Sequence, residues 1–139
     1  MKRYFGLDLG TKTLGVSISE TGVIARSFKT IRFEEENYAK AVELLLTEVK
    51  ENKIDIIILG YPKHMNNDIG IRGKVSEDFK NLINQQSDVE VILWDERLST
   101  KTALRILSDN KRKKEKQRAL KDEMAATVIL QSYLDYKGV

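Results

Sequence analysis

The sequence contains no cysteine, which excludes a disulfide framework and any metal site built on thiolates. Histidine occurs once, at position 64 in a polar stretch, so no pair of histidines suggests zinc either. The first residues, MKRYFGLDLG, hold no apolar stretch long enough for a signal peptide. No later run approaches the ~20 apolar residues of a membrane span. We therefore expect a cytoplasmic protein with no membrane partner.

Positive charge is in slight excess over the 139 residues, with 24 Lys and Arg against 21 Asp and Glu. It is concentrated in KRKKEKQR, residues 111–118, which holds six basic residues and one acid. Such a segment is either a solvated loop or an arm that neutralises nucleic-acid phosphates. Its first four residues are candidate phosphate contacts: Lys111, Arg112, Lys113 and Lys114.

The hydrophobic pattern predicts the element order β-β-β-α-β-α-β-α-α. In chain order, we expect strands around 5–9, 14–19, 23–33, 54–60 and 89–94, and helices over 34–53, after the loop 63–73, through 103–107 and over 119–136. Hairpins followed by alternating helices and strands predict antiparallel pairing first and parallel additions later. This is the order of a ribonuclease H-like fold: an α/β domain over 1–139 with a mixed five-stranded sheet flanked by helices.

Acidic residues occur at three separate places that this fold would bring together. Asp8 interrupts an apolar strand, where a carboxylate costs several kcal/mol unless it finds partners. Asp95 and Glu96 end the fifth strand, and Asp122 opens the last helix, whose small residues 125–126 allow a close approach to the sheet. In the ribonuclease H-like arrangement we expect the first strand to be central and the late strand to lie beside it. One or two Mg²⁺ or Mn²⁺ ions would offset the repulsion between such carboxylates.

Each acid also has an ordinary structural explanation. Asp8 has glycine and threonine close to it in the sequence and can stabilise a turn. Asp95 and Glu96 can be ordinary surface charges. Asp122 can favour the helix dipole. The coincidence of all three at the places where the fold gathers acids favours a shared metal site.

The chain resembles the YqgF family, also called RuvX, over nearly its whole length. The resemblance rests on GLDLGTKTLGVSIS, ILGYPKHMNNDIGIRG, WDERLSTKTA and KDEMAATVILQSYLD, in that order. It implies a divalent-metal-dependent nuclease that hydrolyses phosphodiester bonds, with catalytic and metal-binding acids at Asp8, Glu96 and Asp122. Two positions depart from the family pattern without removing an acid: Tyr61 replaces a usual Leu, and Lys121 a usual Val.

Further residues are predicted to contact the substrate. Gly6 and Gly10 would leave room on either side of Asp8, and the Gly10–Gly15 turn would bring backbone N–H groups near a phosphate. Such contacts position a strand without reading its sequence. With the basic arm, the predicted contacts are Thr11, Lys12, Thr13, Arg72 and Arg97. Trp94 is expected to pack in the core rather than to stack on a base.

The resemblance implies processing of the pre-16S rRNA end during ribosome biogenesis, with RNA favoured over branched DNA and the ribosomal small-subunit particle as a partner. We expect a monomer. One alternative is a Holliday junction resolvase-like endonuclease, which would favour a symmetric dimer. Another is a non-catalytic RNA-binding assembly factor. A third, a sugar-kinase or actin-like ATPase, is suggested by D-L-G-T-x-x-x-G at 8–15 but would need two such domains.

Overall fold

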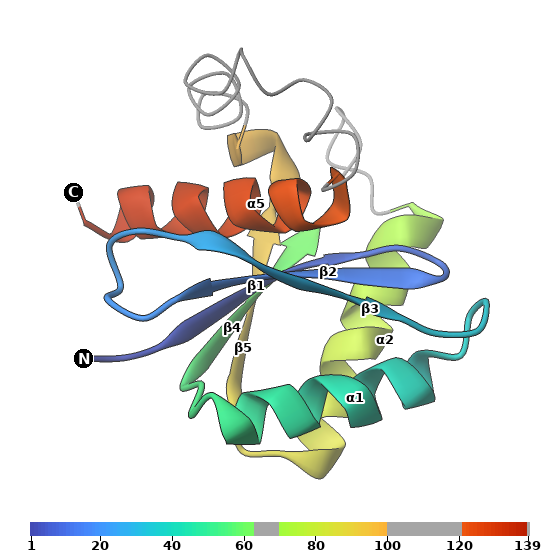
Figure 1. Cartoon of the computed structure of the whole chain (residues 1–139). Coiled ribbons are helices and arrows are strands. Elements are labelled where there is room, and N and C mark those ends of the chain that lie inside the picture. The colour runs from blue at the N-terminus through green and yellow to red at the C-terminus, as the bar shows by residue number, and fades with distance from the viewer. Residues whose placement is uncertain (63–69, 100–120, 139) are drawn as a thin grey trace.

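The structure is a computed structural model, and it describes residues 1–62, 70–99 and 121–138, without the side chains of Ser99, Lys121 and Asp122. Figure 1 shows the elements along the chain. They are β1 (Tyr4–Leu9), β2 (Thr13–Ser19), β3 (Arg26–Arg32), α1 (Tyr38–Glu51), β4 (Ile56–Tyr61), α2 (Ile71–Gln86), β5 (Glu90–Asp95), the 3₁₀ helix η1 (Glu96–Ser99) and α5 (Lys121–Lys137).

The five strands form one mixed sheet in the order β3-β2-β1-β4-β5. β1 pairs antiparallel with β2, and β2 with β3, whereas β1–β4 and β4–β5 are parallel pairs. The predicted fold class and the central position of β1 are thereby confirmed. The expectation that the late strand lies beside the first is wrong, because β4 separates them. With β2 on one edge of β1 and β4 on the other, β5 can pair only with β4.

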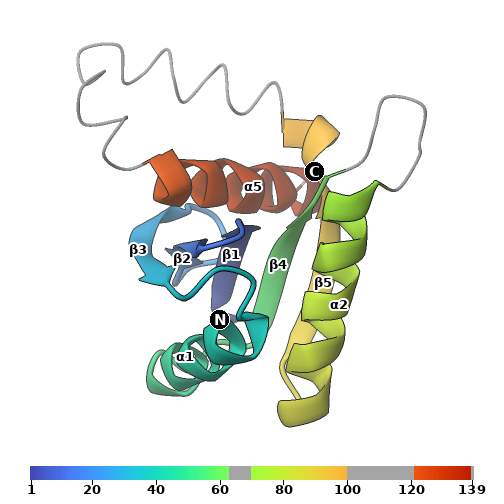
Figure 2. The same ribbon diagram turned by 90° about the vertical axis from the view of Figure 1, so that its right-hand side faces the viewer.

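Helices cover both faces of the sheet. α1 and α2 lie on one face and α5 on the other (Figure 2). Residues of β1 alternate between them: Phe5, Leu7 and Leu9 join the core beneath α1 and α2, while Tyr4 joins the core beneath α5. All six residues of β4 are buried, as its continuous apolar sequence predicts for a strand covered on both faces.

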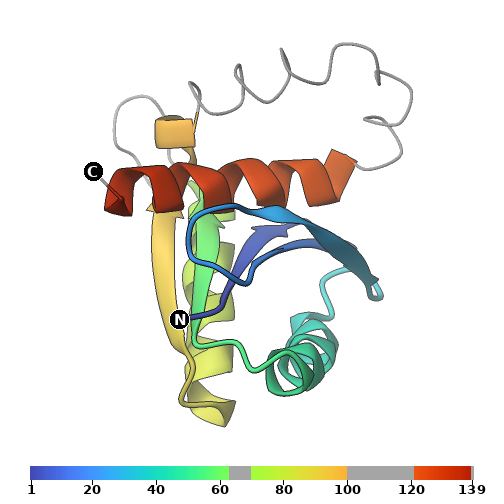
Figure 3. The ribbon, with the colours of Figure 1, turned by 60° about the vertical axis from the view of Figure 1, so that its left-hand side comes forward.

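α5 crosses the strands of the sheet (Figure 3). The helix packs closely against β1 at Gly6. The Ser17 hydroxyl of β2 donates to the Ala126 carbonyl at 2.7 Å, and Ala126 is fully buried. A Cβ added at Gly6 would lie 2.5 Å from the Leu130 Cβ. The space beside Gly6 is therefore filled by the helix, and the expectation that it leaves room next to Asp8 is wrong.

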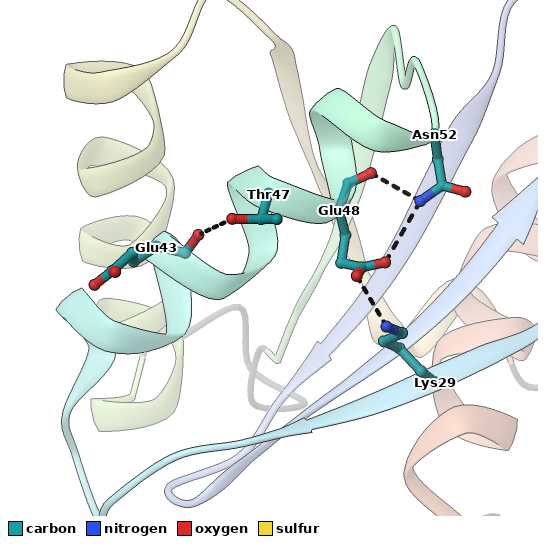
Figure 4. A network of polar contacts seen from close by, with 5 residues as sticks. All are labelled: Lys29, Glu43, Thr47, Glu48 and Asn52. Carbon is teal, nitrogen blue, oxygen red and sulfur yellow. Dashed lines mark hydrogen bonds and ion pairs between the residues drawn. The ribbon is translucent and has the colours of Figure 1, made fainter.

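On the opposite face of the sheet, an ion pair links α1 to β3 (Figure 4). Lys29 of β3 forms an ion pair with Glu48 at 2.9 Å, and the Asn52 amide donates to the Glu48 carbonyl, also at 2.9 Å. Asn37 caps the helix by accepting from the Lys40 N–H. This cap explains why α1 begins at Tyr38 and not at position 34.

Other boundaries differ from the predicted ones by a few residues. α2 begins at Ile71, inside the segment 63–73 that was expected to be a loop. The predicted short helix through Ala103, Leu104 and Leu107 falls outside the described residues. Within the part of the chain that the structure describes, no helix is long and apolar enough to cross a membrane.

Candidate active site

Asp8 lies near the carboxyl end of β1, opposite Gly15 of β2, and is partly buried. The guanidinium of Arg72, in the first turn of α2, donates from Nη2 to the Leu9 carbonyl at 2.5 Å. The carboxyl ends of parallel strands are where open α/β sheets commonly bind ligands. The Asp8 carboxylate and the Arg72 guanidinium therefore both lie at the carboxyl end of β1, where a binding site is expected.

Glu96, the first residue of η1, extends toward Asp8 although the preceding strand, β5, is not adjacent to β1. The pKa of Glu96 is raised from 4.5 to about 7, mainly by burial and secondly by the negative charge of Asp8, while the positive charge of Arg72 lowers it. The Oε1 atom of Glu96 lies 2.6 Å from the point that a Cβ at Gly60 of β4 would occupy. The Glu96 carboxylate therefore extends from the end of β5 back over β4, toward Asp8.

Asp122 stands in the first turn of α5, and its side chain is outside the described residues. The start of this helix contacts the edge strand β3, since Thr30 donates to the Glu123 carboxylate at 3.1 Å and Ser27 bonds Thr127 at 3.2 Å. The role of Asp122 as the third acid stays a prediction.

Asp8 and Glu96 offer the donor chemistry of a hard divalent cation. Burial and, secondly, the charge of Asp8 raise the pKa of Glu96, and a Mg²⁺ or Mn²⁺ ion held by both carboxylates would favour their ionised forms. Among the described residues, no three His, Cys, Asp or Glu side chains are grouped closely enough to hold a metal. The two acids therefore fit a cation that takes its remaining ligands from elsewhere, as Mg²⁺ does from water and substrate phosphate.

The pKa of Glu96 predicts how Glu96→Gln changes stability. A carboxyl whose pKa is raised on folding contributes stability that is fully present below about pH 4.5 and lost as the pH rises through about 7. Without divalent cations at pH 8, we expect E96Q to be more stable than the wild type by about 1–2 kcal/mol, allowing for solvent screening of this partly exposed side chain. At pH 4 the two should match. Thermal unfolding in a chelator measures both, and equal stabilities at pH 8 would contradict the prediction.

Arg97, expected to contact substrate, is engaged with Asp95. The Asp95 carboxylate accepts from Arg97 Nη2 at 2.6 Å, from its Nε at 3.0 Å and from its backbone N–H at 3.0 Å. The hydrogen bonds and charge of Asp95 raise the pKa of Arg97. The pair brackets Glu96 in the chain, so it holds the turn from which the Glu96 side chain projects.

The predicted phosphate turn is held by its own backbone and by the segment after β3. The Gly10 N–H donates to the Thr13 carbonyl at 2.8 Å, so this amide is already used inside the turn. The carbonyls of Thr11 and Lys12 accept from residues 36 and 33. The side chains of Thr11 and Lys12 are exposed, and Thr13 is half-buried. The other predicted contacts, Lys111, Arg112, Lys113 and Lys114, lie outside the described residues.

Tyr61 and Trp94 have structural partners near the site. The buried Tyr61 donates its hydroxyl to Glu77 of α2 at 2.7 Å, which raises the pKa of Tyr61 to about 12. This bond links the end of β4 to α2, the helix that carries Arg72. No local sequence pattern around Tyr61 predicts it. The Trp94 indole donates to Ser132 at 3.1 Å and packs against the core beneath α5, so the packing prediction is confirmed.

Known proteins match the chain over nearly its full length. The family model described as "RuvX: Holliday junction resolvase" matches residues 2–136. Two curated relatives carry the name "Putative pre-16S rRNA nuclease". The one from Onion yellows phytoplasma is 54% identical over 132 residues, 94% of this chain and 87% of its own. The one from a Geobacillus species is 48% identical over 138 residues, 97% of this chain and 99% of its own.

Among solved structures, RuvC of Thermus thermophilus in complex with a Holliday junction substrate matches with a TM-score of 0.70. The match covers 99% of this chain and 96% of that one at 10% identity, so it supports the fold alone. That fold is ribonuclease H-like, in agreement with the sheet order described above. The family model covers residues 2–136, and the two relatives share about half of their residues with this chain. The chain therefore belongs to the RuvX family, which is described as Holliday junction resolvases and includes relatives named "Putative pre-16S rRNA nuclease".

Proposed function

We propose that this protein is a divalent-metal-dependent nuclease that hydrolyses phosphodiester bonds at an end of the small-subunit rRNA precursor. The observation that carries the proposal is the approach of Glu96 to Asp8, with the Glu96 pKa raised to about 7 and Arg72 beside both. Perturbed carboxyls grouped at one end of a sheet are typical of catalytic sites. The names of the close relatives supply the substrate class.

Each residue has a distinct task in this proposal. Asp8 and Glu96 hold the cation, and Asp122 is the third acid. Arg72 presents its positive charge to the phosphate that lies against the acids, while Lys12 and the basic segment after position 110 orient the flanking backbone. Held by these acids, one or two Mg²⁺ or Mn²⁺ ions would supply Lewis acidity for the hydrolysis of the phosphodiester bond.

A second candidate function is cleavage of branched DNA, which the family description favours. It differs from the first in requiring two sites acting together, and thus a dimer. RNA and DNA are distinguished by contacts to the 2′-hydroxyl. An experiment that compares RNA and DNA substrates side by side therefore separates the two functions.

The test is a side-by-side cleavage assay in Mn²⁺ with three substrates: a labelled pre-16S end, the same RNA in a small-subunit particle, and a four-way DNA junction. We expect the RNA to be cut and a chelator to stop the reaction. Symmetric cuts in the junction alone would replace the first function with the second. Tight RNA binding with no cleavage of any substrate would make the protein an assembly factor and would end the nuclease proposal.

A further inference from the structure

Gly60 occupies the middle position between the two acids of the candidate site. Leu7 of β1 is level with Leu59 of β4, so Asp8 and Gly60 are the next residues along the two strands. Gly60 is in turn level with Trp94 of β5, two residues before Glu96. A line drawn across the sheet from Asp8 to the end of β5 therefore passes over Gly60, and any side chain there on the α5 face would stand between the acids.

The missing side chain of Gly60 is replaced by the carboxylate of Glu96. A Cβ built at Gly60 would lie 2.6 Å from Glu96 Oε1 and 2.7 Å from Ile129 Cδ1, both far shorter than van der Waals contact. The Leu7 carbonyl, one residue from Asp8, would lie 3.3 Å away. The carboxylate thus uses the space that every other amino acid would fill with its Cβ.

Backbone conformation does not explain why glycine stands at position 60. Among the described glycines only Gly22 has a positive φ, so Gly60 has an ordinary strand backbone that other residues adopt. The packing of α5 on β4 explains the glycine at position 60 only in part. At Gly6 the close atoms include a Cβ and the backbone carbonyl of Ala126 at 2.8 Å, which cannot move without moving α5. At Gly60 the two closest atoms are the ends of flexible side chains, which can rotate away.

We infer that Gly60 is a positioning residue of the metal site: its absent side chain is what lets Glu96 reach across β4 to share a cation with Asp8. The inference rests on the proposed function in taking Asp8 and Glu96 as the cation ligands. A methyl group at position 60 drives the Glu96 carboxylate away from Asp8 while the strand and α5 keep their places. Gly60→Ala therefore folds but binds the cation poorly.

Mn²⁺ binding to the full chain, measured by calorimetry without substrate, tests this directly. We expect G60A to bind Mn²⁺ about 10- to 100-fold more weakly than the wild type, the range seen when a residue that orients a metal ligand is changed. Carboxyl carbon signals in NMR give a second measurement. In the wild type, Mn²⁺ should broaden the signals of both Asp8 and Glu96, whereas in G60A the Glu96 signal should broaden much less.

Two further variants separate the site from packing. Valine at position 129 lacks the Cδ1 atom, so G60A/I129V removes the second clash and leaves only the one with Glu96. Mn²⁺ affinity should stay low in this double variant. In an E96Q background, adding G60A should cost little more affinity, because the ligand that Gly60 positions is already changed.

Three results would overturn the inference: Mn²⁺ binding by G60A equal to that of the wild type, recovery of affinity in G60A/I129V, or a full additional loss when G60A is added to E96Q. Absence of Mn²⁺ binding by the wild type would overturn it as well. Failure of the proposed function looks different, since the wild type would then bind Mn²⁺, and lose it in G60A, but cleave no nucleic acid.

Discussion

Replacement of Asp8 by asparagine is expected to lower cleavage by at least about a thousandfold, which corresponds to about 4 kcal/mol of transition-state stabilisation. Asparagine keeps the shape of the side chain but removes the charge that Asp8 offers a cation. It also removes the repulsion that raises the pKa of Glu96. D8N should therefore bind Mn²⁺ weakly, show a lower Glu96 pKa in metal-free NMR titration, and unfold no more easily than the wild type.

Asp88→Asn is the matched control. Asp88 is an exposed carboxylate just before β5, so it lies at the amino end of that strand while Glu96 follows the carboxyl end. D88N removes the same charge from the chain and should leave cleavage and Mn²⁺ affinity within about twofold of the wild type. Unchanged turnover in D8N would remove Asp8 from the catalytic site, and an equal loss in D88N would point to net charge as the cause.

Gly6→Ala is expected to destabilise the fold strongly, because the added methyl group would lie between β1 and α5. Its Cβ would lie 2.5 Å from both Leu130 Cβ and Ser17 Oγ, and 2.8 Å from the Ala126 carbonyl. α5 would have to lift from the sheet, which also breaks the hydrogen bond from Ser17 to Ala126. We expect a loss of about 3 kcal/mol in the free energy of unfolding, or a fall in melting temperature on the order of 10 °C.

Gly10→Ala serves as the control for the G6A measurement. An added Cβ at Gly10 would meet Thr13 atoms no closer than 3.2 Å, a tight contact within a turn and not within the core. Chemical denaturation of both variants with chelator present isolates folding from metal binding. If G6A lost less than about 1 kcal/mol, the close packing of α5 on β1 would not be the constraint that keeps glycine at this position.

Much of the fold follows from local patterns that the chain carries by itself. Alternation in β1 separates Phe5, Leu7 and Leu9 from Tyr4, Gly6 and Asp8, and the structure places the apolar set in the larger core. The continuous apolar run of β4 and the helical spacing of α1 are likewise reproduced. Periodicity reports which face of an element is buried, because burial selects side chains one element at a time.

The order of the strands in the sheet and the contacts between distant segments are seen only in the tertiary structure. Nothing in the local pattern says that β4 lies between β1 and β5, and the expectation of neighbouring acidic strands failed for that reason. The same applies to the bonds from Arg72 to Leu9 and from Tyr61 to Glu77, which join segments 63 and 16 residues apart.

The amino-acid sequence by itself determined the residue types available for chemistry: carboxylates at Asp8 and Glu96, no thiolate, and one histidine. It thereby determined a preference for a hard cation over zinc. Only the tertiary structure decided that Glu96 extends toward Asp8, because β4 separates β1 from β5 and the Glu96 carboxylate lies in the space above Gly60. Composition sets which ligands exist, whereas distances between them arise when the sheet is assembled and covered by α5.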